Sequence, residues 1–335
     1  RHYDYERRLA AACRRRLASR PVVRDPARLR ERLDELFAAN AVRLGARPDW
    51  QKIAAALAVR NTFTVISGGP GTGKTTTVVN ILACLLADDP ELRIALAAPT
   101  GKAAARMKEA LQERAASLPA DLRERLPTEA HTVHRLLGVV EGSRQFRHDR
   151  TNPVAYDVVV VDEASMLDLT LAAKLIEAVP ETSRLILLGD KDQLAAVEAG
   201  SVFAELSASP ALSAPCRAEL GRLTGFAEAA LSPPQVAPEG TLCDCAVWLQ
   251  ENFRFANQPG IGRLARFVNE MQSAEAIPWL LQEEHADVRL TELPASELSD
   301  LQLQRLLEGF SATLDAVRRG ADPAATHEAF SRFRI

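Results

Sequence analysis

The sequence is poor in cysteine and has no long apolar run. Among 335 residues there are five cysteines, and their spacing fits neither a zinc site nor a disulfide framework. No stretch reaches the roughly 18 uninterrupted apolar residues that cross a bilayer. The start of the chain is arginine-rich and interrupted by acidic residues, unlike a signal peptide. We therefore expect reduced thiols, no membrane partner and a cytoplasmic protein.

The sequence also lacks a strong excess of charge of either sign. Its formal net charge is −3, and with 47% hydrophobic and 25% charged residues its composition is that of an ordinary globular protein. Any nucleic-acid affinity must therefore come from a local basic stripe. Residues 1–32 are rich in arginine and fit solvated helix faces or a partner-docking surface better than a DNA contact. Residues 144–150 fit a hairpin against a nucleic-acid strand or a plain surface loop.

Against this background, one segment carries a complete chemical signature. Residues 68–75 read Gly-Gly-Pro-Gly-Thr-Gly-Lys-Thr, a phosphate loop set between an apolar run and a helical pattern. Glycines let backbone N–H groups surround a phosphate, and the helix that follows adds its positive end. Lys74 is placed to reach the β and γ phosphates, and Thr75 to ligate Mg²⁺. The predicted nucleotide contacts are Gly68, Gly69, Pro70, Gly71, Thr72, Gly73, Lys74, Thr75 and Thr76.

A second signal is an acidic pair after four consecutive valines. Val158 to Val161 predict a buried parallel strand, and such strands place functional residues at their carboxyl ends. Asp162 is predicted to serve Mg²⁺, directly or in its outer shell. Glu163 is predicted to orient and deprotonate a water for attack on the γ phosphate.

Two further strand-like runs also end in polar residues. Thr100 and Lys102 follow the run 92–98 and are candidates to hold a phosphate of another ligand. Asp190 and Gln193 follow the run 184–188 and are candidates to sense a γ phosphate.

The alternation of strands and helices from about residue 49 to 206 predicts an α/β fold with a doubly wound parallel sheet. We divide the chain into a helical, partner-docking region at 1–45, a P-loop domain at 46–240 and a further segment at 241–335. The domain includes a proline-rich linker or crossover around one short helix at 207–240 and a possible small hairpin at 139–153. Residues 330–335 read as an opening strand.

These motifs resemble superfamily 1 helicases, and within them the RecD branch, the alpha subunit of exodeoxyribonuclease V (RecBCD). The resemblance runs from about Trp50 to Gly262. It is carried by Trp50 to Lys52 (Q motif), Gly68 to Thr75 (motif I), Ala98 to Ala104 (motif Ia), Asp162 to Ser165 (motif II), Gly189 to Gly200 (motif III), Glu251 to Arg254 (motif IV) and His131 to Gly138. It implies that 46–240 is a RecA-like motor domain and that 241–335 begins a second one.

The resemblance implies further roles around the nucleotide. Gln51 would read the adenine edge, which makes ATP the expected nucleotide. Phe253 would stack on adenine, although related branches carry a tyrosine there. Gln193 and Arg254 would act on the γ phosphate, with Arg254 reaching across from the second domain so that closure on ATP moves a strand.

The resemblance also implies DNA as a partner. The cleft that holds the phosphates of a single strand would be lined by Pro99, Thr100, Lys102, Thr132 and His134. For His134 a packed or capping role is equally compatible. RecB-type and RecC-type subunits are the implied protein partners, and a nuclease site is expected on a partner because no further carboxylate cluster stands out.

Motifs V and VI find no match before Ile335, and the chain begins without Met, so the sequence predicts an internal fragment. The leading hypothesis is the motor core of a DNA-dependent ATPase that moves 5′ to 3′ on single strands and unwinds duplex ends for recombinational repair. The alternative is a nucleotide-binding and partner-binding module with little turnover. Gln51, Gln193 and Arg254 together disfavour a different kind of P-loop switch.

Overall fold

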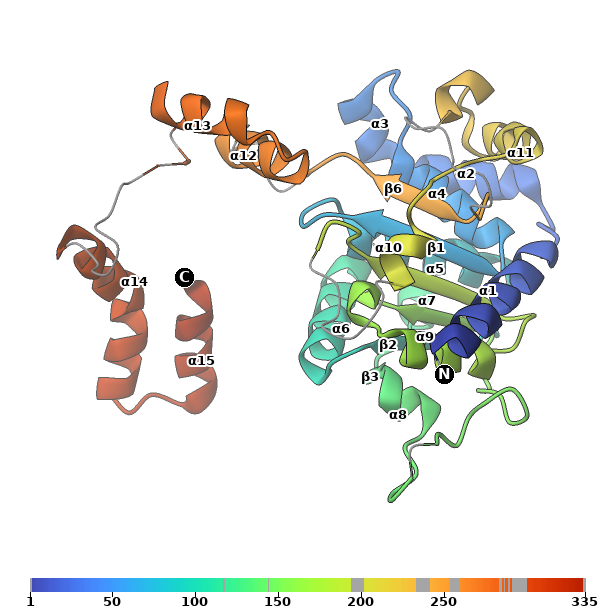
Figure 1. Ribbon diagram of the computed structural model, residues 1–335, viewed down its shortest axis with the longest axis horizontal. Helices are drawn as coiled ribbons and strands as arrows, with labels where there is room; N and C mark the ends of the chain where they lie inside the picture. The colour runs from blue at the N-terminus through green and yellow to red at the C-terminus, as the bar shows by residue number, and fades with distance from the viewer. Residues whose placement is uncertain are drawn as a thin grey trace. The chain divides into compact units, whose positions relative to one another are not determined.

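The computed structural model describes residues 2–116, 118–143, 145–193, 202–232, 242–253, 259–282, 285, 287–288, 290 and 300–333. The chain divides into two compact units, residues 1–257 and residues 258–335. Figure 1 shows the helices and strands of both units.

The first unit is built on one parallel sheet in the order β3-β2-β4-β5-β1-β6. Because parallel neighbours cannot be joined by tight turns, the chain crosses between strands through helices. This arrangement confirms the predicted doubly wound α/β fold. The strands are β1 (Phe63–Gly68), β2 (Ile94–Ala98), β3 (Ala130–Thr132), β4 (Val158–Val161), β5 (Arg184–Gly189) and β6 (Ala246–Leu249).

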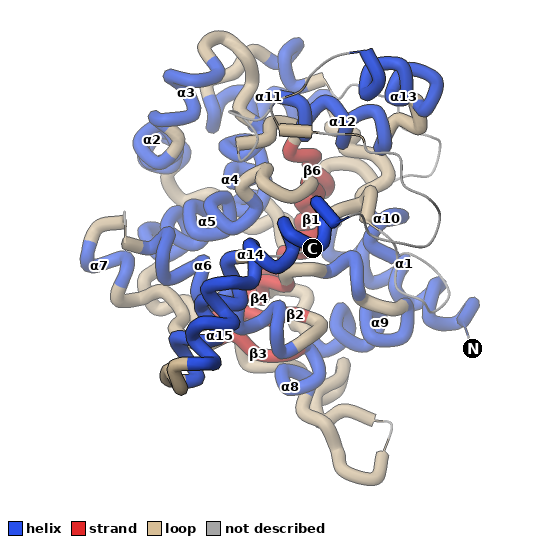
Figure 2. The backbone as a smooth tube through the Cα atoms, turned by 90° about the vertical axis from the view of Figure 1, so that its left-hand side faces the viewer, coloured by secondary structure: helices blue, strands red, loops and turns tan. Residues whose placement is uncertain are grey.

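Helices cover both faces of this sheet, and the strands alternate between two apolar cores. Val158 and Val160 pack into one core, while Val159 and Val161 pack into the other, as the two-residue period of a strand requires. The first core is closed by α2 (Pro26–Leu36), α4 (Trp50–Arg60), α5 (Lys74–Asp88), α6 (Gly101–Ala115), α7 (Ala120–Arg123) and α11 (Ala214–Thr224), and the second by α1 (His2–Ala18), α8 (Val133–Leu137), α9 (Leu169–Ala178) and α10 (Val202–Leu206). Figure 2 shows the strands between these two layers.

The boundary predicted after residue 240 is wrong for the residues that follow it. β6 pairs with β1 in parallel register, with Val65 opposite Ala246 and Gly68 opposite Leu249. The apolar run around β6 is buried by extending the first sheet, so the change of unit comes only after Asn257. Residues 214–224, within the predicted linker, form α11. Ser213 caps this helix, and Leu220 is completely buried in the first core.

The arginine-rich start of the chain belongs to the first unit. Helix α1 packs on α9, and two of its exposed arginines pair with acidic residues of or just after α9: Arg8 with Glu177 and Arg15 with Glu181. Arg16 is completely buried and donates to the carbonyl oxygens of Ser183 (3.1 Å), Ile176 (3.3 Å) and Val179. It therefore caps the end of α9, whose last carbonyls have no partner within the helix. Three short elements complete the described part of the first unit: α3 (Ala38–Leu44) and two single 3₁₀ turns at Ala164–Met166 and Glu228–Leu231.

The described part of the second unit consists of the helices α12 (Pro259–Asn269), α13 (Ser273–Gln282), α14 (Asp300–Arg318) and α15 (Pro323–Arg332). The strand predicted from residue 330 is wrong, because Asp322 caps a helix that Pro323 opens and that runs to Arg332. Phe330 stacks on Phe310 of α14 at 5.9 Å between ring centroids. Among the described helices of either unit, none has the length and apolarity needed to cross a membrane.

Candidate nucleotide site

The phosphate loop joins β1 to α5 at the carboxyl edge of the sheet. Gly71 and Gly73 adopt left-handed backbone angles (φ +81° and +79°), which glycine tolerates without strain. A Cβ on Gly68 would lie 2.5 Å from the Thr72 hydroxyl, and a Cβ on Gly73 would clash with the side-chain amide of Gln51. The loop therefore needs glycine both for its turn and for close packing.

The loop has the form of an anion cradle. Lys74 Nζ lies 2.5 Å from the carbonyl oxygen of Gly68 and 3.4 Å from that of Gly69, so the ammonium group is folded over the loop. The Thr72 hydroxyl donates to the Gly69 carbonyl oxygen at 2.8 Å. Lys74 begins α5, and Thr75 and Thr76 lie in its first turn, half-buried. The helix N-terminus and Lys74 together place positive charge where the motif predicts the phosphates.

The acidic pair follows β4 at the same edge of the sheet. The backbone N–H of Glu163 donates to Asp162 Oδ1 at 2.9 Å. Burial raises the pKa of Asp162, and the neighbouring Glu163 adds to this shift, while the Glu163 N–H and the charge of Lys74 oppose it. Glu163 itself has a left-handed backbone (φ +53°), an uncommon and costly conformation for a residue with a side chain. Strain of this kind is typical of functional positions.

The turn after β5 is tied to the end of β1. The Lys191 N–H donates to the Ser67 hydroxyl at 3.0 Å, and buried Asp190 accepts from the Asp192 N–H at 3.1 Å. A Cβ on Gly69 would lie 3.8 Å from Asp190 Oδ2. Asp190 thus lies beside the loop, whereas the side chain of Gln193 is exposed. The rest of the predicted motif III, residues 194–200, lies outside the described residues.

A small pocket lies on the other side of the loop. It is lined by Asp49, Trp50, Gln51, Thr72, Leu249, Gln250, Glu251 and Phe253. The Phe253 N–H donates to the Gly71 carbonyl oxygen at 2.8 Å, and Asn252 Nδ2 to that of Pro70 at 2.9 Å. Gln51 Nε2 donates to the Thr72 carbonyl oxygen at 2.7 Å. The two predicted base-contacting residues, Gln51 and Phe253, therefore line one pocket within the first unit. Arg254 lies outside the described residues.

Helix α3 contacts the residues that line this pocket through side chains that sequence reasoning missed. Asn40 Nδ2 donates to Asp49 Oδ2 at 2.9 Å and to Gln51 Oε1 at 2.8 Å. The Arg43 guanidinium lies 4.9 Å from the centre of the Phe253 ring. Asn40 and Arg43 lie on one face of the helix, since they are three residues apart. No motif marks them, because their partners are distant in sequence.

The turn after α3 adds a third contact with the pocket's lining, an ion pair at 2.6 Å between Arg47 and Glu251. The segment from Asn40 to Arg47 crosses the predicted domain boundary after residue 45. Its residues up to that boundary were predicted to dock a partner. The contacts of Asn40, Arg43 and Arg47 place it against the pocket instead.

The predicted strand-binding residues lie where β2 and β3 end. Ala98 and Thr132 are register partners and end β2 and β3, so Thr100 and Thr132 lie at the same end of neighbouring strands. Each hydroxyl caps a helix, accepting at 3.2 Å from the N–H of Ala103 and of Arg135, respectively. Pro99 is half-buried, and Lys102 is exposed. The residues therefore share one edge of the sheet.

His134 is exposed and packs edge-on against Phe146, with ring centroids 5.7 Å apart. Phe146 forms an isolated antiparallel bridge with Val139, and Lys174 Nζ lies 4.9 Å from the centre of its ring. His134 thus contacts the segment in which a small hairpin was predicted. Arg144 lies outside the described residues.

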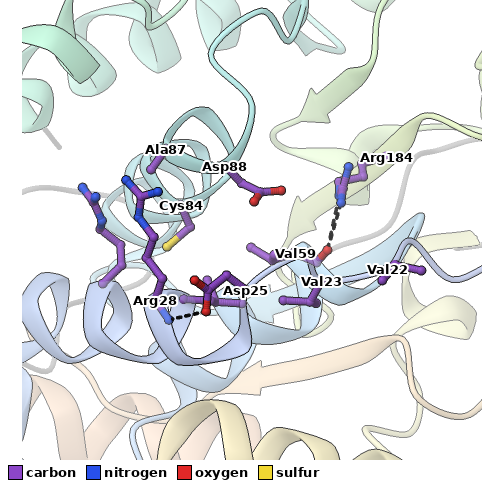
Figure 3. Close-up of a pocket in the computed structure, with 11 residues that line it drawn as sticks. Val22, Val23, Asp25, Arg28, Val59, Cys84, Ala87, Asp88 and Arg184 are labelled. Carbon is purple, nitrogen blue, oxygen red and sulfur yellow. Dashed lines mark hydrogen bonds between the residues drawn. The ribbon is translucent and has the colours of Figure 1, made fainter.

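A separate cavity of about 60 Å³ lies between α2, the end of α5 and the start of β5. Figure 3 shows it, with Arg184 donating to the Val59 carbonyl oxygen at 3.1 Å and the Asp25 carboxylate capping α2. Burial lowers the pKa of Arg184. Since Arg184 opens β5, this cavity lies at the amino ends of the strands and is no part of the nucleotide site.

A parallel sheet with a phosphate loop after β1 and an acidic pair after β4 defines a P-loop protein of the RecA-like class. A family model described as an AAA domain matches residues 51–199. The RecBCD enzyme subunit RecD of Haemophilus influenzae is 40% identical over 245 residues, 69% of this chain and 37% of that protein. The same subunit of Mycobacterium tuberculosis is 56% identical over 164 residues, 47% of this chain and 28% of that protein.

The ATP-dependent RecD2 DNA helicase of Deinococcus radiodurans is 44% identical over 136 residues, 41% of this chain and 16% of that protein. The chain is similar to these RecD proteins, in agreement with the resemblance that its motifs carry. It spans less than two fifths of the length of these relatives.

Proposed function

We propose that this chain is the nucleotide-binding part of an ATP-dependent DNA helicase subunit of the RecBCD type. The observation that carries the proposal is the meeting of Lys74 with Asp162 and Glu163 at one sheet edge, in a chain whose relatives are named RecD. The proposal includes 5′ to 3′ movement on a single strand, unwinding of duplex ends in double-strand-break repair, RecB-type and RecC-type partners, and a cytoplasmic location. A second RecA-like domain that begins within residues 258–335 is also part of it.

The chemistry follows from the side chains at this edge. Lys74 and the N-terminus of α5 would neutralise the β and γ phosphates of ATP, while Thr75 and Asp162 would hold Mg²⁺. When bound, Mg²⁺ would supply positive charge that offsets the negative charge of these phosphates. Glu163 would accept a proton from the attacking water. Glycine at positions 68 and 73, where a Cβ would clash, supports a cradle shaped for a phosphate chain.

Single-stranded DNA would lie along the ends of β2 and β3. Thr100 and Thr132 cap helices there, so backbone N–H groups of two helix starts lie beside them. Lys102 adds an exposed positive charge, and Pro99 and His134 complete the proposed set. Contacts of this kind hold a strand by its phosphates without reading its sequence.

The alternative is a nucleotide-binding and partner-binding module with little turnover of its own. The same loop supports it, because Lys74 and Thr75 suffice to bind a nucleotide.

The test is ATP hydrolysis with and without single-stranded DNA, for this chain and for a chain extended to the length of its relatives. We expect strand-stimulated turnover in the extended chain and its abolition by Lys74→Ala. Lys108→Ala, at a half-buried position of α6 where the lysine pairs with Glu129, serves as the matched control, and its turnover should match the wild type. ATP binding without stimulated turnover in either chain would favour the alternative. Undetectable ATP binding by both chains would overturn both proposals.

A further inference from the structure

A chain of hydrogen bonds runs from the Asp49 carboxylate to the phosphate loop through two side-chain amides. It connects Asp49, Asn40, Gln51 and the Thr72 carbonyl oxygen. We propose that Asn40 is the positioning residue that fixes the Gln51 amide in the orientation that selects adenine over guanine. The inference rests on the proposed function, since it concerns the base of the nucleotide held by the phosphate loop.

Asp49 determines which amide atoms donate and which accept in this series of hydrogen bonds. Its carboxylate caps α4 by accepting from the N–H groups of Gln51 (2.9 Å) and Lys52 (3.3 Å), and it also accepts from Asn40 Nδ2 at 2.9 Å. An ionised carboxylate can only accept, so the Asn40 amide must turn its nitrogen toward Asp49. The same nitrogen then donates its second hydrogen to Gln51 Oε1 at 2.8 Å.

The second amide is fixed from both ends. Gln51 Oε1 faces the Asn40 donor, and Gln51 Nε2 faces the Thr72 carbonyl oxygen at 2.7 Å. Rotating this amide by 180° would bring two donors together at Asn40 and two acceptors together at Thr72. Gln51 is buried, so such mismatches would not be relieved by water.

The fixed amide keeps one hydrogen-bonding position on each end. The Gln51 amide nitrogen has two hydrogens, and its oxygen has two lone pairs. The bond to Thr72 uses one hydrogen, and the bond from Asn40 uses one lone pair. One donor and one acceptor of the same amide therefore remain unused. Adenine offers the complement, an acceptor at N7 and a donor at N6, whereas guanine offers two acceptors, N7 and O6. The orientation of Gln51 therefore matches adenine and mismatches guanine.

Asn40 reaches the pocket because α3 is held against it. Arg43 lies over the Phe253 ring, and Arg47 pairs with Glu251. Asn40 itself is half-buried and lies outside the phosphate cradle. Removing its amide should therefore affect recognition of the base without affecting the phosphates.

The experiment compares dissociation constants for Mg·ATP, Mg·GTP and inorganic tripolyphosphate. Asn40→Ala should weaken ATP binding about tenfold, as expected for losing one buried hydrogen bond and the amide orientation it sets. GTP and tripolyphosphate should bind within about twofold of the wild type, so the preference for ATP falls about tenfold. Asn40→Asp, which points an acceptor at Gln51 Oε1, should lose the preference at least as far. Val42→Ala, at an 89% exposed position of α3, is the matched control and should bind all three ligands as the wild type does.

Each outcome decides between explanations. An unchanged ratio of ATP to GTP affinity in Asn40→Ala, alongside lost binding in Lys74→Ala, would overturn the role of Asn40 and leave the proposed function standing. Equal losses for ATP and tripolyphosphate in Asn40→Ala would also overturn it, because the defect would then lie in the loop. Undiminished binding of ATP and tripolyphosphate by Lys74→Ala would instead overturn the proposed function.

Discussion

The two sides of the candidate nucleotide site are built in different ways. The phosphate side comes chiefly from one stretch, Gly68 to Thr76, whose residues are adjacent in sequence and in space. The base side is assembled from α3, the start of α4 and the segment after β6. The first is readable as a motif, whereas the second exists only after the sheet and its helices have packed.

The two sides meet at the backbone of the loop. Phe253 and Asn252 bond to the carbonyl oxygens of Gly71 and Pro70, and the Gln51 amide bonds to that of Thr72. The loop contributes backbone carbonyl oxygens to this joint and Phe253 contributes its backbone N–H, so replacing a loop side chain or the Phe253 ring should leave the other side intact. The predictions below test that independence, beginning with the largest expected effect.

On the phosphate side, Glu163→Gln should lower the rate of ATP hydrolysis by about 10²–10⁴-fold, the usual contribution of a general base. ATP binding should be unchanged, because Lys74 and the loop remain. The measurement pairs steady-state hydrolysis in the extended chain with a direct binding titration. Exposed Glu109→Gln is a matched control that should hydrolyse ATP normally. Loss of ATP binding in Glu163→Gln would mean that Glu163 holds the metal and that Asp162 is the general base.

On the base side, Phe253→Ala should weaken ATP binding about tenfold, since stacking of a base on an aromatic ring contributes about 1–3 kcal/mol. Phe253→Tyr, which keeps the ring, should bind ATP as the wild type does. Tripolyphosphate binding, measured by competition with a fluorescent nucleotide, should be the same in all three proteins. A matching loss of tripolyphosphate affinity would show that the two sides are not independent.

The smallest expected effect is on stability without ligand. Burial raises the folded-state pKa of Asp162 above its unfolded value. The folded state therefore favours the protonated carboxyl, and the associated stability is present at low pH and lost as pH rises through the folded pKa. Asp162→Asn has a neutral side chain at every pH and should not lose this stability. Its melting temperature should therefore exceed that of the wild type by about 2–4 °C near pH 7.

This difference should shrink as the pH falls through the folded-state pKa of Asp162, because the Asp162 side chain then becomes neutral. Thermal melts of the two proteins across this pH range measure it. A wild-type protein that is the more stable of the two at neutral pH would show that the Asp162 charge is compensated in the folded state.

Much of the fold was predictable because its signals are local. The runs before Gly68 and Asp162 are β1 and β4, and the prediction of a doubly wound sheet is confirmed. The short helix expected within the proline-rich segment is α11, which a proline in its first turn opens. The predicted domain boundary failed at β6. The run at β6 suggested a new domain, because sequence does not tell which sheet a strand will join.

The amino-acid sequence by itself determined the phosphate cradle, since its glycines, Lys74 and the helix start act through neighbours along the chain. It also determined the acidic pair, because a buried strand delivers its next residues to the sheet edge. Only the tertiary structure decided that Asn40 faces Gln51 and that Phe253 lies on the loop. These contacts join residues far apart in the chain, and they depend on how helices dock against a finished sheet.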